Sequence, residues 1–243
     1  MSPALESPIE INGCEIRNRL YRAPLLECAG EDEDAVDVLI DELEPAAASG
    51  TGLIFQGAAP VRDASGRVAP NMTPFADPDF VASLEPLTAA VHDHDGRIFV
   101  QLAHGGIRTL ETWPAEFRRA NPGLEQLAVS PLPWQLRAAA ATGALDYDLH
   151  VLSTAEVYDL AEDFGRAAQY AVDAGYDGIH LSGANMGIVQ QFLSPLYNHR
   201  EDEFGPSEGA PYAGGVRFLE SVHDAIREHA GDVPLVTKVP SEA

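Results

Sequence analysis

The sequence predicts a single parallel α/β domain. Short apolar, β-prone runs alternate along the chain with longer segments of helical period, which is the pattern of parallel βα units. The length of 243 residues suits one (β/α) barrel or one large α/β domain. No internal repeat or low-complexity linker divides the chain. Residues 1–243 are therefore expected to form one domain.

The first half of the chain is predicted to form a hairpin, three strands and two helices. Asn12-Gly13 favours a tight hairpin turn, Pro24 ends the following strand, and Gly50 closes the first long helix. The third strand is almost wholly apolar, as expected of a strand buried on both faces. In order, the elements are the hairpin Ile9–Asn12 with Cys14–Ile16, strand Arg19–Ala23, helix Ala35–Ala48, strand Leu53–Gln56, helix Asp79–His92 and strand Ile98–Leu102.

The second half begins with a long segment, Arg108 to Leu152, that has no steady period and is expected to be functional or an insertion. Regular elements then resume, with Thr154 expected to cap the next helix. They are helix Thr154–Ala174, strand Gly178–Leu181, helix Gly215–Glu228 and strand Leu235–Val239. Five strands in βα order are too few to close an eight-stranded barrel.

Acidic residues far outnumber basic ones. The chain has 38 Asp and Glu against 15 Lys and Arg, a net charge of −23, and Lys238 is the only lysine. Such a surface repels nucleic acid. Two interpretations stay open: an ordinary acidic enzyme, or a halophilic protein from a high-salt cytosol, where salt screens charges over about 3 Å at 1 M.

Membrane and secretion signals are not found. No window reaches the roughly 18 apolar residues of a membrane span. The start, Met1–Ile11, lacks the basic patch and apolar core of a signal peptide, which predicts a cytoplasmic protein without a membrane partner. Cys14 and Cys28 match no metal-ligand spacing and are expected to be reduced and structural.

Candidate site residues follow the strands, because ligands of parallel α/β folds bind beyond the carboxyl ends of the strands. These segments are Ala23–Leu26, Gly57–Ala59, Gln101–Gly106 and Ser182–Asn185. Small residues there suit a flat ring lying against backbone, with the Gln101 amide bonded to its polar edge. The alternative is that Gln101 is an ordinary amide at a strand end.

Several motifs together resemble the old yellow enzyme family of NAD(P)H:flavin oxidoreductases. The most specific is the run Gln191–Gly205, and the weaker ones are Asn18-Arg19 through Pro24, Gln101–Gly106, Ala174–Gly178 and Arg217–Leu219. The resemblance implies the amino-terminal portion of an eight-stranded (β/α) barrel that holds FMN at the carboxyl ends of its strands. It also implies hydride transfer from NAD(P)H to the flavin, and from flavin N5 to the β-carbon of an activated alkene.

The resemblance also implies residue roles. Pro24, Leu25, Ala58 and Gln101 fall where the family contacts the isoalloxazine ring, and Leu26 falls where many members tune the flavin with Thr or Cys. Asn185 matches the second member of the pair that binds the substrate's carbonyl oxygen. Ser182 stands at the first member, which is usually His. Paired donors there would stabilise negative charge developing on that oxygen.

Other positions depart from the family pattern. At the position where the family commonly has a tyrosine that supplies a proton, this chain has Gly187. At the position of the arginine expected near flavin N1 and O2, it has Gly215. Arg108 lies one place beyond the family's Gln-x-x-His-x-Gly-Arg arginine, where this chain has Ile107. The resemblance stops near Leu235–Val239, before the three strands that carry the family's FMN phosphate site.

The histidines and one acidic run have structural alternatives. Strand alternation places His180 on the same face as Ser182, where it could replace the missing histidine or be a satisfied core residue. Solvated or structural roles are expected for His92, His94 and His199 and, in the family's loop, for the run Glu201–Glu203.

Two functional hypotheses follow. The first is an FMN-dependent NAD(P)H oxidoreductase of the ene-reductase type, acting on a small molecule, whose remaining strands come from a partner chain or were lost. The second is a degenerate barrel fragment or interaction subunit that does not bind flavin alone.

Overall fold

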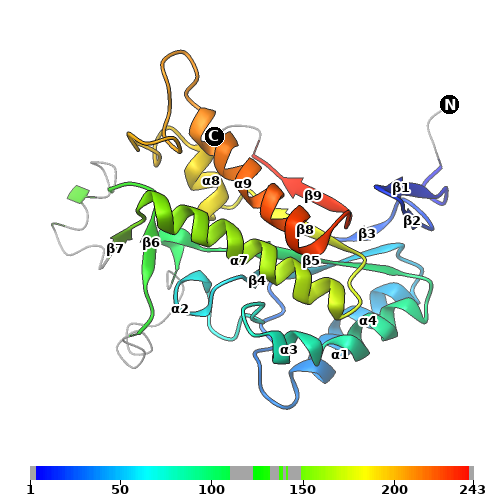
Figure 1. The fold of residues 1–243 in the computed structure, drawn as a ribbon. Coiled ribbons are helices and arrows are strands. Elements are labelled where there is room, and N and C mark those ends of the chain that lie inside the picture. Colours follow the sequence, from blue (N-terminus) through cyan, green and yellow to red (C-terminus); the bar gives the residue numbers. More distant parts are fainter. Residues whose placement is uncertain (1–3, 110–122, 132–136, 139–140, 142–148, 241–243) are drawn as a thin grey trace.

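The computed structural model describes residues 4–109, 123–131, 137–138, 141 and 149–240. Its centre is a parallel five-stranded sheet in the order β3-β4-β5-β8-β9 (Figure 1). These strands are β3 (Tyr21–Arg22), β4 (Leu53–Pro60), β5 (Arg97–Ala103), β8 (Gly178–Ser182) and β9 (Leu235–Lys238). An antiparallel hairpin, β1 (Ile9–Ile11) with β2 (Cys14–Ile16), precedes them. The predicted α/β class, strand number and hairpin are confirmed.

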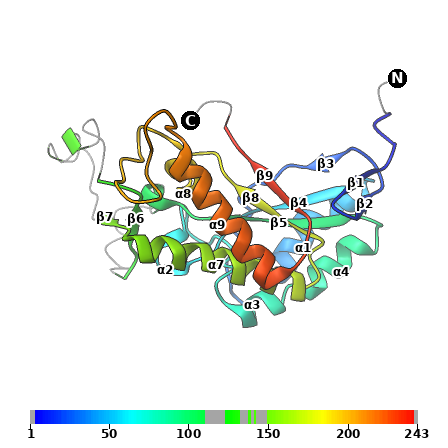
Figure 2. The ribbon, with the colours of Figure 1, turned by 45° about the horizontal axis from the view of Figure 1, so that its top comes forward.

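Helices connect the strands and pack on one face of the sheet (Figures 1 and 2). The long ones are α1 (Ala35–Ala48), α7 (Thr154–Asp173) and α9 (Ala213–Ala230), and the shorter ones are α3 (Pro78–Ala82) and α4 (Glu85–His92). Three brief helical turns follow strand ends or lie near them: α2 (Asp63–Gly66), the 3-10 turn η1 (Gly106–Arg108) and α8 (Ile188–Leu193). No described helix has both the length and the apolar composition needed to cross a membrane.

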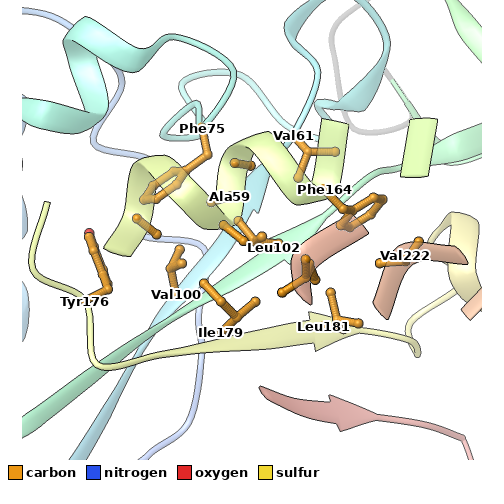
Figure 3. Packing of buried hydrophobic residues seen from close by; sticks show 14 of the residues in the cluster. Ala59, Val61, Phe75, Val100, Leu102, Phe164, Tyr176, Ile179, Leu181 and Val222 are labelled. Carbon is orange, nitrogen blue, oxygen red and sulfur yellow. The ribbon is translucent and has the colours of Figure 1, made fainter. Parts of the chain in front are cut away.

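The main core lies between the sheet and this helix layer. Alternate strand residues such as Val100, Leu102 and Ile179 point at the helices and meet Phe164 of α7 and Val222 of α9 (Figure 3). All five side chains are fully buried. The period of two along the strands and the helical period of α7 and α9 therefore share one apolar layer.

The opposite face of the sheet carries a smaller core. Leu53, Phe55 and Phe99 pack there against Ile16 of the hairpin. Phe55 and Phe99 meet edge to face with ring centroids 5.8 Å apart. The hairpin thus covers the amino-terminal part of this inner face, and the carboxyl end of the strands is left to the pocket described below.

Most predicted boundaries agree with the structure. Helix α1 spans the predicted residues, and Asn12 and Gly13 take positive φ angles of 44° and 82° in the hairpin turn. Strand β4 continues four residues beyond Gln56, through a bulge that shifts the register between Gln56 and Ala58. Small residues such as Gly57 carry little strand signal, so the sequence pattern ended the strand too early.

Two helix predictions are wrong in detail. The expected helix Asp79–His92 is two helices, α3 and α4, with a break at Ser83-Leu84. Pro86 lies at the start of α4 and has no N–H to continue α3, which explains the break. Ser153, and not Thr154, caps α7, in a reciprocal capping box with Glu156.

The region 108–152 is only partly described. Its described residues include β6 (Gln126–Ala128) and β7 (Leu149–Val151), which form a separate two-stranded parallel sheet. Residues 110–122, 132–136, 139–140 and 142–148 lie outside the described structure, so the expectation of a functional loop or insertion there stays a prediction.

Candidate active site

One pocket lies at the carboxyl ends of the sheet strands. Its walls come from the segments after β3, β4, β5 and β8, which lie far apart in the sequence. All seven sequence-predicted site residues line it: Pro24, Leu25, Leu26, Ala58, Gln101, Ser182 and Asn185. The position rule for parallel sheets therefore located the pocket correctly.

The segment after β3 is held against β4 by a close backbone contact. A Cβ at Gly57 would overlap the carbonyl oxygen of Leu25. Beside it, the buried Glu27 carboxylate accepts a hydrogen bond from the Gly57 N–H at 2.8 Å and pairs with Arg22 at 2.8 Å. Burial raises the pKa of Glu27, and Arg22 opposes that rise. Leu25 and Leu26 thus line the pocket on a segment that the Gly57 backbone and the Glu27 hydrogen bond hold against β4.

Gln101 and His180 form a buried pair on the inner face. The Gln101 amide nitrogen lies 3.1 Å from His180 Nδ1, and the His180 ring packs on Phe55 with centroids 4.9 Å apart. Burial is the main cause that lowers the pKa of His180 to about 4, so this ring is neutral near pH 7. His180 does not line the pocket. It is a satisfied core residue that contacts Gln101.

The segment after β8 has an unusual backbone. Asn185 and Met186 are consecutive residues with positive φ, 58° and 59°. This region favours glycine, and Asn tolerates it better than Met. Gln190 Oε1 accepts from the Met186 N–H at 2.7 Å, and Arg108 donates to the Asn185 carbonyl oxygen. These contacts hold the Asn185 side chain at the pocket wall.

Two further polar residues line the pocket, His104 and Arg108, which the sequence analysis placed in or beside a family motif without assigning them a role. His104 is fully buried between the Ser65 hydroxyl, 3.1 Å from Nε2, and the Gly106 N–H, 3.0 Å from Nδ1. Burial lowers its pKa to about 3, so it is neutral. Arg108 is the one charged side chain among the described lining residues.

The other histidines lie elsewhere, each with a partner. His92 contacts Asp177, His94 contacts Glu44, and His199 Nε2 lies 2.9 Å from the Leu196 carbonyl oxygen. Within the described ranges, no group of three or more His, Cys, Asp or Glu side chains is arranged to hold a metal ion.

The acidic run 201–203 is structural at its centre. Asp202 accepts from Arg200, from the Thr154 hydroxyl and from the Phe204 N–H. These bonds, led by Arg200, lower its pKa to about 2. Arg200 also donates to the carbonyl oxygens of Val129 and Leu152, and so ties this loop to the segments beside β6 and α7.

Two glycines that depart from the family pattern, Gly187 and Gly215, lie in different environments. Gly187 lines the pocket, so no side chain projects there from that residue. Gly215 lies in α9 instead, where a Cβ would come 2.6 Å from the Phe192 carbonyl oxygen of α8. The expectation that residue 215 faces a flavin ring is wrong, because this glycine serves close helix packing.

The pocket walls fit a flat ring better than a phosphate. The described lining residues are mainly small and apolar with a buried amide, and none of them carries a carboxylate although the chain has a net charge of −23. Among the described lining residues, only Arg108 offers a charge for an anionic group, and it already donates to a backbone carbonyl. The residues present match the isoalloxazine part of FMN and not its phosphate.

A parallel half-barrel with a pocket at the carboxyl ends of its strands is the architecture of (β/α)-barrel enzymes, and comparison with known proteins supplies the family. The model of the NADH:flavin oxidoreductase / NADH oxidase family matches residues 4–239. The chain belongs to this family, also called the old yellow enzyme family.

Two oxidoreductases are among the proteins with a similar sequence. An NADPH dehydrogenase from Geobacillus sp. (strain WCH70) is 30% identical over 241 residues, covering 98% of this chain and 64% of that protein. An NADH:fumarate oxidoreductase from Klebsiella pneumoniae (strain 342) is 28% identical over 229 residues, covering 93% of this chain and 23% of that protein.

Solved structures give the same fold. The old yellow enzyme homologue from Zymomonas mobilis superposes with a TM-score of 0.77 at 25% identity, covering 98% of this chain and 63% of that one. Old Yellow Enzyme from Pichia sp. AKU4542 superposes with a TM-score of 0.82 at 22% identity, covering 97% of this chain and 59% of that one. This chain therefore spans less than two thirds of the length of these relatives.

Proposed function

We propose that this chain supplies the ring-binding half of an FMN-dependent NAD(P)H oxidoreductase of the ene-reductase type. The observation that carries the proposal is the convergence of seven predicted site residues, from four separate strand ends, on one pocket. Family membership supports the chemistry. The acceptor would be a small molecule with an activated alkene.

The residues have distinct roles in this proposal. The backbone of Pro24–Leu26 and Ala58 supports the flat ring, and Gln101 bonds its polar edge. FMN, when bound, would supply a hydride carrier between NAD(P)H and the acceptor. Asn185, with Ser182, donates hydrogen bonds to the acceptor's carbonyl oxygen, where negative charge develops during hydride transfer. Gly187 provides no acid, so the proton comes from another group or from water.

We also propose that further βα units complete the barrel, either from the rest of a longer chain or from a partner. In the described structure, β3 and β9 are the edge strands of the sheet. Beside β9, a groove contains the apolar residues Leu181, Val216, Leu219 and Leu235 between the strand and α9. Glu220, His223, Asp224 and Thr237 complete the lining, so an unpaired edge lies next to a partly apolar groove, which suits the addition of another strand and helix.

Flavin titration tests the ring pocket separately from the phosphate site. Riboflavin has the ring of FMN without its phosphate, so we expect the chain in high salt to bind both flavins weakly and with similar affinity. Gln101→Leu should weaken binding of both, whereas Gln169→Leu on α7 should not. The titration is followed by the quenching of flavin fluorescence.

Completion of the barrel adds a second comparison. Co-expression with three further βα units should strengthen binding of FMN more than that of riboflavin, because only FMN gains a phosphate site. A folded chain that binds neither flavin, alone or completed, would contradict the proposal. That result would favour the second function, a degenerate fragment or interaction subunit. Two departures from the family pattern also favour it: Leu26 stands where many members have Thr or Cys, and Gly187 offers no acid.

A further inference from the structure

A single buried amide connects two walls of the pocket. Gln191 of α8 has no exposed surface. Its Nε2 donates to the carbonyl oxygens of Gly105 at 3.0 Å and Met186 at 2.6 Å, and its Oε1 accepts from the Ile107 N–H at 3.2 Å. Gly105 and Ile107 follow β5, and Met186 follows β8. The Gln191 side chain therefore bonds to both segments at once.

The surrounding backbone is shaped around this amide. Gly106 has a φ of 60°, and a Cβ there would overlap the Gln191 side-chain oxygen. Met186 has a φ of 59°, a backbone conformation that residues other than glycine rarely adopt unless neighbouring contacts stabilise it. Two other bonds also join the segments: the Ile188 N–H donates to the His104 carbonyl oxygen at 2.8 Å, and the Arg108 side chain donates to the Asn185 carbonyl oxygen. The Gly105 carbonyl oxygen also accepts from the Arg108 N–H, whereas Gln191 satisfies the Ile107 N–H and the Met186 carbonyl oxygen.

We infer that Gln191 is a positioning residue of the pocket, which acts with Arg108 and Gln190 to hold Asn185 at the wall by fixing its neighbour Met186 to the segment after β5. Gln191 does not line the pocket itself. It acts through Asn185, and this functional part of the inference rests on the proposed function. Its structural part, the coupling of the two segments, does not.

The run Gln191–Gly205, which begins with Gln191, also contains a residue suited to a matched control variant. Asn198 is also a buried side-chain amide, 2% exposed, and donates to the carbonyl oxygens of Phe192 and Phe204 at 2.8 and 2.7 Å. Its bonds stabilise the loop after α8 and touch neither pocket segment. Asn198→Leu and Gln191→Leu each remove a buried amide, so both lower stability, and only the second should release the pocket segments.

Hydrogen exchange tests the coupling without any flavin. In Gln191→Leu we expect amide exchange in 105–109 and 185–188 to rise by roughly tenfold or more over Asn198→Leu, because local opening no longer breaks a shared bond network. Equal exchange in the two variants would overturn the inference. If Gln191→Leu does not fold, Gly106→Ala displaces the amide from the other side. Unchanged exchange at 185–188 in that variant would equally overturn it.

Activity of the completed enzyme tests the functional part. Because Gln191 acts through Asn185, Gln191→Leu should lower kcat in the parent but change it little in an Asn185→Ala background. Independent losses that multiply would contradict the positioning role. Absence of activity in the parent would count against the proposed function, and the exchange result would still decide the coupling.

Discussion

Gly57 determines how closely the segment after β3 approaches β4. Gly57→Ala places a methyl group on the Leu25 carbonyl oxygen, so the segment must move and the Glu27 bond to the Gly57 N–H must break. We expect a loss of about 1–3 kcal/mol in the free energy of unfolding. Urea unfolding measures it, with Gly123→Ala as control because a Cβ at residue 123 meets no atom within 4 Å. Equal stability of the two variants would show that the segment yields freely.

Asn185 is the predicted anchor of the acceptor. In the completed enzyme, Asn185→Ala should lower turnover by roughly ten- to a thousand-fold, the range for loss of one donor to a developing oxyanion. Asn185 has a positive φ, so Asn185→Gly removes the amide without adding backbone strain and should lose as much. Met186→Gly, which relaxes the next residue, controls for flexibility. Unchanged kinetics would remove Asn185 from the mechanism, and a large loss in His180→Ala would move its role there.

Two buried neutral histidines predict sensitivity to acid. The pKa of His180 is lowered to about 4 and that of His104 to about 3, both chiefly by burial. The unfolded chain therefore binds more protons than the folded one below about pH 6.5, and stability falls as the pH drops from there toward 4.

Replacing one histidine should make this dependence shallower. Between about pH 6 and pH 4.5, His180→Leu should reduce the slope of unfolding free energy against pH by up to about 1 kcal/mol per pH unit. Urea unfolding at several pH values measures it. His223→Leu, on the half-exposed surface of α9, shows the effect of losing a histidine as such. An unchanged slope in His180→Leu would mean that His180 is not neutral in the fold.

At this scale the sequence located the pocket but not its supports. Residues such as Gln101 and Asn185 were predictable because a strand end and a motif marked them. Glu27 and the Arg108 contact to Asn185 were not, because they depend on which loops meet in space.

Helix α7 begins with a reciprocal cap. Glu156 accepts from the Ser153 N–H at 2.7 Å, and the Ser153 hydroxyl accepts from the Glu156 N–H at 3.3 Å. Ser153→Ala should therefore cost about 1 kcal/mol of stability. Thermal unfolding measures it, with Ser221→Ala on the exposed side of α9 as control. A loss no larger than that of the control would show that the cap is dispensable.

Elements with a strong period were predictable from the sequence. Helix α1 has a clear apolar stripe and a closing glycine, and its limits were predicted correctly. The six-residue α8 was missed because so short an element shows no period, and the α3–α4 break was missed because Pro86 also fits within the first turn of a helix.

The whole molecule carries the charge prediction. At a net charge of −23, unbalanced carboxylates repel over about 10 Å in 0.1 M salt and over about 3 Å at 1 M. Stability should therefore rise with KCl, as the halophilic interpretation expects. Circular dichroism against KCl concentration measures it. Equal stability from about 0.1 to about 3 M would leave the chain an ordinary acidic protein.

The architecture as a whole was predictable, because alternating βα segments allow few arrangements of a parallel sheet. The pairing of β5 with β8 across 108–152 is an example, since that pairing needs no knowledge of the intervening residues.

The location of Gln191 also has a consequence for biosynthesis. A growing chain emerges from the ribosome amino terminus first. The segments after β3, β4 and β5 emerge first, and Gln191, which bonds to both the β5 and the β8 walls, emerges after all of them. A nascent chain that has not yet reached β8 also lacks Gly178. The Phe99 ring packs directly on the backbone of this glycine, where a Cβ would overlap the ring. The pocket therefore forms only after β8 and α8 have been translated.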